Sequence, residues 1–221
     1  MIVAIDGPAG AGKSSVARRL AHHLGFQFLD TGAMYRAVTW AALRKHYGAG
    51  DADAIAELAQ RMSLIMHDNR VLLDGHDVTA LIRTSEVAGS VYLAADNRRV
   101  RERLVHLQRE FAEGNDTVTE GRDQGTVAFP HAECKIYLTA SPEERATRRH
   151  SELQSRGEQI SWEEVLRQIN ERDRRDTQRE FGPLRRAEDA IDVLTDGLNT
   201  EQVIARLEAI VRERQQKLSL V

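Results

Sequence analysis

Residues 1–15 read MIVAIDGPAGAGKSS, an apolar run that leads into a glycine-rich turn ending in Lys13 and Ser14. This turn follows the pattern G-x-x-x-x-G-K-[ST], in which consecutive backbone N–H groups wrap a polyphosphate at the N-terminus of a helix. Residues 2–5 are predicted to form the preceding strand, and residues 14–24 the amphipathic helix that follows. The stretch therefore predicts an α/β protein that binds a nucleotide.

Each position of this phosphate loop has a predicted role. Lys13, expected to be exposed, would reach the β- and γ-phosphates of ATP, and the Ser14 hydroxyl would complete the shell of a nucleotide-bound Mg²⁺. The glycines allow positive φ angles and a close approach of the backbone to phosphate. Mg²⁺, with ATP as co-substrate, is the expected cofactor. The predicted ATP-binding residues are Gly7, Pro8, Ala9, Gly10, Ala11, Gly12, Lys13, Ser14 and Ser15.

The composition is that of an ordinary globular protein. The 221 residues, 41% hydrophobic and 29% charged, suit one α/β domain with insertions. No apolar run approaches the ~18 residues of a membrane span, and residues 2–5 are too short for the core of a signal peptide. The single cysteine, Cys134, excludes a disulfide framework. We expect a cytoplasmic, monomeric protein that does not contact a membrane.

Charge argues against a protein that holds nucleic acid mainly by its phosphates, because the net charge is −3. The basic residues are nevertheless mostly arginines, and eleven of them lie between Arg145 and Arg186. A GC-rich genome is one explanation. The other is phosphate binding, since the planar guanidinium group binds phosphate oxygens in pairs.

The first half of the chain reads as helices around a small strand-rich insert. Thr31 is a plausible N-cap of the helix over 33–46. Tyr35 and Arg36 lie in the first turn of that helix, where their side chains can face the phosphate loop. The alternative for Arg36 is a solvated charge on the helix surface. His67-Asp68-Asn69-Arg70 indicates a hairpin turn. The remaining predicted segments are an extended piece at 27–29, a helix over 51–62, strands at 64–66 and 71–73, a turn at 75–76 before 78–82, and a helix over 100–111.

Two buried strands are predicted in the second half, at 117–119 and 136–139, each followed by polar residues. Ligands of open α/β sheets bind at the carboxyl ends of the strands, so Arg122 and Asp123 would lie near the phosphate loop. The alternative for these two residues is a structural ion pair. His131 and Cys134 lie between the strands, but two potential ligands do not make a metal site.

An arginine-rich helical hairpin follows, with one helix from Pro142 to about residue 155 and a second from 162 to about 180. It could be a lid that closes over phosphates, or an exposed charged hairpin. Arg172, Asp176 and Arg179 share one face of the second helix by their spacing. A final strand at 190–194 and a helix from 199 or 200 to about 217 complete the chain.

Five stretches together resemble the bacterial cytidylate kinases, a family of P-loop nucleoside monophosphate kinases. They are IDGPAGAGKSS, LDTGAMYRAV, DGHDVTALIRTSEVA, EGRDQGTVAFPHAECKIYLTASPEERATRR and ERDRRDTQREFGPL. The resemblance implies a three-layer α/β sandwich with a central parallel sheet, in a single P-loop kinase domain over 1–221. It places the monophosphate-binding region and its strand-rich insert at about 33–102 and the lid at about 145–165.

The resemblance also implies residue roles. Lys13, Arg122, Arg172 and Arg179 would be catalytic, with Arg179 near the transferring phosphates. Where the family has a serine that touches cytosine, this chain has Tyr92, with Ser90 two residues earlier, and Gln124 replaces an apolar residue. One base contact is therefore shifted or missing. The implied CMP-binding residues are Thr31, Tyr35, Arg36, Arg101, Arg122, Asp123, Arg172 and Asp176.

The reaction implied by this resemblance is phosphoryl transfer from ATP to CMP or dCMP, which gives ADP and CDP or dCDP. A different P-loop kinase, for example one that acts on UMP or another small molecule, is the alternative. A GTPase would need an N-K-x-D motif, and no lysine here follows an asparagine. An ATP-dependent nucleic-acid-binding protein is disfavoured by the acidic balance. Small-molecule substrates are therefore the expected partners, without stable binding to nucleic acid.

Overall fold

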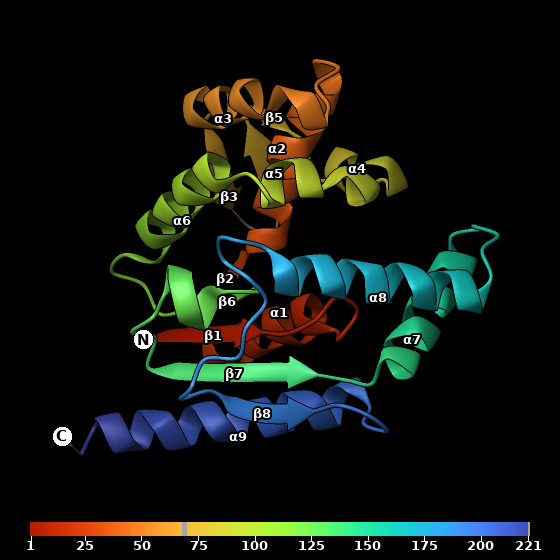
Figure 1. Cartoon of the computed structure of the whole chain (residues 1–221). Coiled ribbons are helices and arrows are strands. Elements are labelled where there is room, and N and C mark those ends of the chain that lie inside the picture. The colour runs from red at the N-terminus through yellow and green to blue at the C-terminus, as the bar shows by residue number, and fades with distance from the viewer. Residues whose placement is uncertain (68–69, 221) are drawn as a thin grey trace. The chain divides into compact units, whose positions relative to one another are not determined.

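The computed structural model describes residues 1–67 and 70–220, and the chain forms two compact units (Figure 1). Unit 1 comprises Met1–Phe28 and Gly114–Val221, and unit 2 comprises Leu29–Glu113. The chain thus leaves unit 1 after its second strand begins, builds unit 2, and returns to complete unit 1.

A five-stranded sheet forms the centre of unit 1, in the order β2-β6-β1-β7-β8. β1 pairs in parallel with β6 and β7, and β7 pairs in parallel with β8. Buried parallel strands are typically continuous apolar runs, as β1 is. The predicted fold class, an α/β protein with a central parallel sheet, is confirmed. The strands are β1 (Ile2–Asp6), β2 (Gln27–Asp30), β6 (Thr117–Gly121), β7 (Cys134–Thr139) and β8 (Ile191–Leu194).

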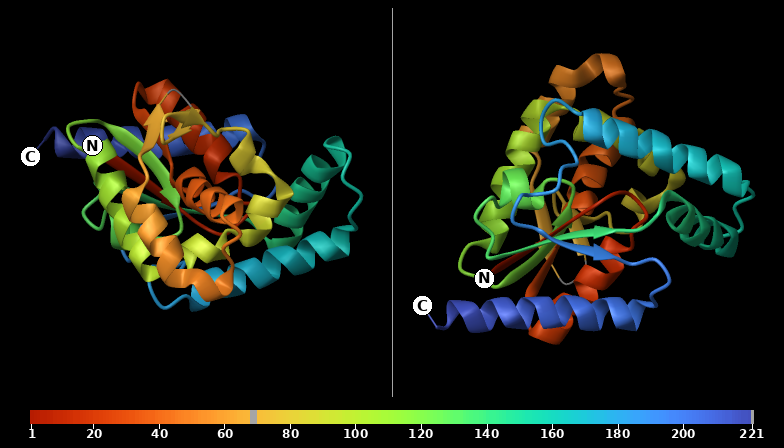
Figure 2. Two further views of the ribbon diagram at one scale, coloured as in Figure 1. Left: turned by 90° about the horizontal axis from the view of Figure 1, so that it is seen from above. Right: turned by 60° about the horizontal axis from the view of Figure 1, so that its bottom comes forward.

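Two helices of unit 1 pack on the sheet. α1 (Lys13–Leu24) and α9 (Thr200–Leu218) contact each other and share one apolar cluster with the strands, which includes Leu20, Ile136 and Leu207. The right-hand view of Figure 2 shows α9 alongside β8. Asn199 caps α9 with its side chain, as one of the two predicted caps.

The other two long helices of unit 1 form the predicted hairpin. α7 (Pro142–Ser155) follows the carboxyl end of β7, and α8 (Trp162–Gln178) runs back along it (Figures 1 and 2). Side chains of Ser141 and Ser161 cap the two helix starts. The helices are joined by a small apolar cluster made of Ala146, Leu153, Val165 and Ile169.

Unit 2 has its own apolar core, built on α2 and including Met34, Val38, Ile55 and Leu104. Antiparallel β3, β4 and β5 make its three-stranded sheet. Short 3₁₀ turns occupy Ala49–Asp51 and Leu81–Arg83. Its elements are α2 (Thr31–Arg44), α3 (Ala52–Arg61), β3 (Leu64–His67), β4 (Arg70–Leu73), β5 (His76–Asp77), α4 (Ser85–Ser90), α5 (Tyr92–Ala95) and α6 (Arg98–Ala112).

Unit 2 differs from expectation in two places. The N-cap of α2 is Asp30, whose Oδ1 accepts from the Ala33 N–H at 2.8 Å, so the prediction that Thr31 caps this helix was wrong. A carboxylate is at least as good a cap as a hydroxyl and gains from the helix dipole. The sequence did not predict the short helices α4 and α5. The predicted hairpin is confirmed by its paired strands, although Asp68 and Asn69 of its turn lie outside the described residues.

A helix that crosses a membrane must be both long and apolar. Over residues 1–67 and 70–220, no helix combines the length and the apolar character that crossing a bilayer requires.

Candidate active site

The phosphate loop connects β1 to α1 and has a backbone that requires glycine. Gly7 has φ +151°, and a Cβ there would lie 1.9 Å from the Leu138 carbonyl oxygen, so no other residue fits beside β7. Gly12 has φ +82° and ends the loop immediately before α1 begins at Lys13. The predicted ATP-binding residues therefore form one continuous turn at the N-terminus of a helix, the geometry that favours anions.

Lys13 is buried, with 5% of its surface exposed, which corrects the expectation of an exposed loop lysine. Its Nζ folds back and donates to the Pro8 carbonyl oxygen at 2.7 Å, inside the turn. Burial, with the charge of Arg122 as a second cause, lowers the pKa of Lys13 to about 7. The carboxylates of Glu120 and Asp6 act in the opposite direction and only partly offset this shift.

Ser14, the predicted Mg²⁺ ligand, lies next to a carboxylate that the sequence did not single out. Its hydroxyl donates to Glu120 Oε1 at 2.7 Å. Glu120 is 4% exposed and faces the loop because β6 pairs with β1 in the register Ile5↔Glu120. The hydroxyl of Ser14, in the first turn of α1, and the carboxylate of Glu120, near the end of β6, are oxygen ligands of the kind that Mg²⁺ accepts. The only hint in the sequence was the position of Glu120 at the end of a predicted strand.

Arg122 and Arg179 converge on Asp176. Arg122 Nε donates to Asp176 Oδ2 at 2.7 Å, and Arg179 Nη2 donates to Asp176 Oδ1 at 2.6 Å. Burial alone would raise the pKa of Asp176, yet Arg122, Arg172 and Arg179 lower it to about 2. The predicted grouping of Arg172, Asp176 and Arg179 is thus present at the end of α8. The alternative of an ion pair between Arg122 and Asp123 gives way to a pair between Arg122 and Asp176.

Asp123, one of the implied CMP-binding residues, is 2% exposed and directly precedes a π-helical turn, Gln124–Ala128. Its carbonyl oxygen accepts from the N–H groups of Val127 at 2.8 Å and Ala128 at 3.1 Å. The turn is fixed from the sheet by Asp6, whose two carboxylate oxygens accept from the N–H groups of Gln124 and Gly125, each at 2.8 Å.

Asp6 was not predicted to belong to the site. Burial raises its pKa to about 7, although the two N–H bonds oppose the shift. It is the last residue of β1 and pairs in register with Gly121 and Tyr137 on the two neighbouring strands. No sequence pattern joins Asp6 to residues 124 and 125, because parallel strand pairing alone brings them together.

The other four predicted CMP-binding residues lie in unit 2. The Arg101 guanidinium lies 5.2 Å from the ring centroid of Tyr35, and its Nη1 donates to the Ala95 carbonyl oxygen at 3.0 Å. Arg36 donates to Asp30 at 3.3 Å, so it is an ion-paired residue rather than a fully solvated charge. Arg83, which the sequence analysis missed, lies 3.8 Å from the same carboxylate. Thr31 begins α2 beside this group.

The two residues considered for a shifted base contact lie close together in the chain of unit 2. Ser90 is the last residue of α4, and Tyr92, 38% exposed, begins α5.

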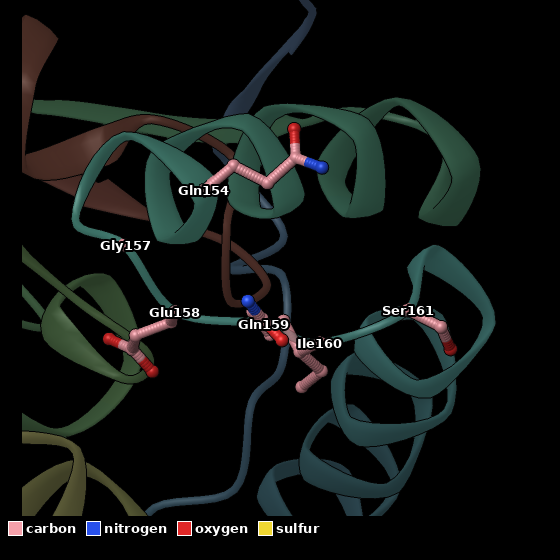
Figure 3. A pocket seen from close by; sticks show the side chains of 6 residues that line it. All are labelled: Gln154, Gly157, Glu158, Gln159, Ile160 and Ser161. Carbon is pink, nitrogen blue, oxygen red and sulfur yellow. The ribbon is translucent and has the colours of Figure 1, made fainter.

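A separate hollow lies at the tip of the hairpin (Figure 3). It is lined by one stretch of chain and contains none of the predicted site residues; Gln154 comes from the end of α7 and Ser161 precedes α8. The lining residues are Gln154, Gly157, Glu158, Gln159, Ile160 and Ser161. In the described part of the chain, no three His, Cys, Asp or Glu side chains are grouped to hold a metal ion by themselves.

Solved structures with a similar fold include two small-molecule kinases. A shikimate kinase from Bacteroides thetaiotaomicron matches with a TM-score of 0.51 at 14% identity, covering 96% of this chain and 98% of that chain. A gluconokinase from Sinorhizobium meliloti 1021 matches with a TM-score of 0.52 at 15% identity, covering 99% and 95%. At such low identity these matches support the fold alone.

The sequence comparisons are more specific. A family model described as cytidylate kinase matches residues 3–213. The cytidylate kinase of Rhodopirellula baltica is 52% identical over 213 residues, covering 96% of this chain and 93% of the relative. That of Carboxydothermus hydrogenoformans is 50% identical over 215 residues, covering 96% and 97%. The chain belongs to the cytidylate kinase family.

Proposed function

We propose that this protein transfers the γ-phosphoryl group of ATP to CMP and dCMP, giving ADP and CDP or dCDP. The observation that carries the proposal is the phosphate loop with its buried Lys13, next to the arginine–aspartate group of Arg122, Asp176 and Arg179 in the same unit. An anionic loop ligand and an anionic acceptor both need concentrated positive charge and fixed N–H groups. Membership of the cytidylate kinase family supports the choice of acceptor.

The proposed chemistry needs no general base. A phosphate oxygen of CMP is already anionic at neutral pH and attacks the γ-phosphorus, while the bond to the β,γ-bridging oxygen breaks and ADP leaves. Catalysis is then positioning plus stabilisation of the transferring phosphoryl group by Lys13 and by the catalytic arginines Arg122, Arg172 and Arg179. This fits a site that is rich in arginine and contains no histidine among its proposed residues.

For the acceptor, we assign Asp123 to the exocyclic amine of cytosine, and Asp176 with Arg172 to the pentose. The support for Asp123 is its burial at the end of β6, in a turn that Asp6 fixes through two hydrogen bonds. In unit 2, the residues proposed for CMP form two local groups, Tyr35 with Arg101 and Arg36 with Asp30, and Thr31 adjoins the second.

Mg²⁺ is proposed as the metal that accompanies ATP. Ser14 Oγ and Glu120 Oε1 are the residues that would hold it, directly or through water, and their oxygens suit a hard divalent ion. When bound, the ion would neutralise charge on the phosphates. Glu120→Gln should raise the Mg²⁺ concentration needed for half-maximal rate, whereas Glu133→Gln should not, because Glu133 bonds the Ile2 N–H at the start of β1. Equal Mg²⁺ requirements in both variants would remove Glu120 from the metal site.

One experiment tests the main proposal. ADP production from ATP is measured in a coupled assay with CMP, dCMP, UMP, AMP, shikimate and dephospho-coenzyme A. We expect CMP and dCMP to give the highest kcat/KM values. A higher value for UMP would support the alternative nucleoside monophosphate kinase, and one for shikimate or dephospho-coenzyme A would support another small-molecule kinase.

We further propose that the protein works as a cytoplasmic monomer that does not bind nucleic acid stably. The supporting observations are the net charge of −3 and the single buried Cys134. Light scattering should give the mass of one chain. Retention of labelled RNA, if seen, should disappear at moderate salt; salt-resistant retention would contradict this part of the proposal.

A further inference from the structure

In the phosphate loop, the N–H and the carbonyl oxygen of Ala9 are both hydrogen-bonded to one part-buried ion pair, Arg145 with Asp173. Arg145, on the first turns of α7 and 4% exposed, donates from Nη1 to the Ala9 carbonyl oxygen at 2.9 Å. The same nitrogen donates to Asp173 Oδ2 on α8. The other carboxylate oxygen of Asp173 accepts from the Ala9 N–H at 3.2 Å. Both helices of the hairpin are therefore bonded to the same loop residue.

The neighbouring residue extends this contact by packing. A Cβ added at Gly10 would lie 3.3 Å from the Arg145 Cβ and 3.8 Å from Ile169 Cδ1. Ile169 also belongs to the apolar cluster that joins α7 to α8. The base of the hairpin thus meets the apex of the loop without space for another side chain between them.

Two nitrogens of the Arg145 guanidinium group, Nε and Nη1, already donate hydrogen bonds to protein acceptors. Its Nε donates to the Ala140 carbonyl oxygen at 3.0 Å, in addition to the two bonds made by Nη1. Held in this way, Arg145 can affect phosphate binding through the backbone of the phosphate loop, which it fixes at Ala9. A loop whose N–H groups already converge loses less conformational freedom when it binds a polyphosphate, so its affinity is higher.

We propose that Arg145 and Asp173 are positioning residues that hold the phosphate loop in its triphosphate-binding shape and transmit the position of the α7–α8 hairpin to that loop. This inference rests on the proposed function, in which the loop binds ATP. It assigns Arg145 no direct contact with the nucleotide, and it gives Asp173 a role distinct from that of Asp176, which lies one helical turn further along α8.

The test compares single variants of this pair with a control on the same helix. Asp173→Ala removes both bonds of the carboxylate. Asp173→Asn replaces one of the two acceptor oxygens with an NH2 donor, which would face either the Ala9 N–H or Arg145. Arg145→Lys cannot reach all three acceptors. Arg148→Lys is the matched control, because Arg148 also lies on α7 and bonds a backbone carbonyl, that of Thr195, away from the loop. Dissociation constants for ATP, tripolyphosphate and CMP are measured by calorimetry, with the melting temperature of each variant.

We expect Asp173→Ala and Arg145→Lys to weaken ATP binding about tenfold and Asp173→Asn to weaken it less. Tripolyphosphate should lose the same factor as ATP, since the loop binds phosphates. CMP binding and the Arg148→Lys variant should stay within twofold of the wild type. In the double variant Arg145→Lys with Asp173→Asn, the loss should be smaller than the product of the single losses, because both residues act through Ala9.

Three results would overturn the inference. A lower melting temperature with unchanged ATP affinity makes the pair purely stabilising. A loss confined to ATP and absent for tripolyphosphate makes Arg145 a contact of the nucleoside, and weaker CMP binding places the pair on the acceptor side. If the wild-type protein itself does not bind ATP or phosphorylate CMP, the proposed function fails instead, so the two failures are distinguishable.

Discussion

Arg122 Nε donates to Asp176 Oδ2 over 2.7 Å, joining the segment after β6 to the last turn of α8. Asp176 is the shared acceptor of Arg122 and Arg179, so its removal leaves two part-buried guanidinium groups without their carboxylate. A single substitution therefore disturbs the pentose contact proposed for Asp176 and the arginines proposed for the phosphates.

Asp176→Ala should raise the KM for CMP and lower kcat, with little effect on the KM for ATP. Hydrogen bonds to charged groups contribute about 1.5–3 kcal/mol, so kcat/KM for CMP should fall on the order of tenfold to a hundredfold. Steady-state kinetics with each substrate varied in turn will check this. Asp192→Ala, which removes an exposed partner of Arg186, is the control. A change confined to the KM for ATP would place the end of α8 on the donor side.

Lys13→Ala should nearly abolish phosphoryl transfer, by about 10²- to 10³-fold in kcat, the usual cost of one preorganised donor. The fold should survive, because Lys13 is buried at a cost to its charge and donates to the Pro8 carbonyl oxygen of its own loop. Lys217→Ala, at an exposed helix position, serves as the control. Retention of more than about a tenth of the activity would refute the assignment of the loop.

Asp123→Asn should change base selectivity. Cytosine presents an N4 amine donor, which a carboxylate accepts, whereas uracil presents an O4 acceptor, which a carboxylate repels. Asparagine can turn its amide to donate toward O4. We expect the transition-state stabilisation for CMP to weaken by about 1 to 3 kcal/mol, which lowers kcat/KM for CMP. The kcat/KM for UMP should rise or stay unchanged, and the affinity for ATP should be unaltered. An equal fall for CMP and UMP would mean that base choice is made elsewhere.

Because of Asp6, the free energy of unfolding should fall as pH rises through the acidic and neutral range. Its pKa is raised from 3.8 to about 7 in the folded protein, so between these values the folded state binds the proton more tightly than the unfolded state. This stabilisation is complete below the unfolded pKa and is lost as pH rises through the folded one. Between pH 4.5 and 7.5 the loss is on the order of 3 kcal/mol.

The measurement is urea unfolding of the wild type and Asp6→Asn at several pH values. The difference between their free energies of unfolding should shrink, or reverse, as pH rises, because asparagine does not titrate. Loss of one of the two N–H bonds lowers the stability of the variant at every pH by a constant amount. A difference that stays the same from pH 4.5 to 7.5 would show that Asp6 ionises normally.

Local patterns in the sequence predicted the phosphate loop, the strands of the parallel sheet and the helical hairpin. A glycine-rich turn between an apolar run and an amphipathic segment has few other structures available, and helix starts at Ser141 and Asn199 carry strong capping residues. Helical spacing likewise placed Arg172, Asp176 and Arg179 on one face.

Residues that act across the sheet were not predictable in the same way. Asp6, Glu120 and Asp173 obtain their partners through strand register or helix packing, and each has a partner more than a hundred positions away in the chain. The π-helical turn after Asp123 depends on the same long-range bonds from Asp6. Asp30 and Thr31 are adjacent, and both are good capping residues. The sequence alone therefore does not decide that Asp30 caps α2.

The Gln27 N–H donates to the Asp116 carbonyl oxygen at 2.8 Å, next to the two points where the chain leaves unit 1 and returns to it. A segment whose two attachment points are already held together can change in length at a small cost in loop-closure entropy. Unit 2 can therefore lengthen or shorten with little effect on how the two ends of the chain in unit 1 are held together.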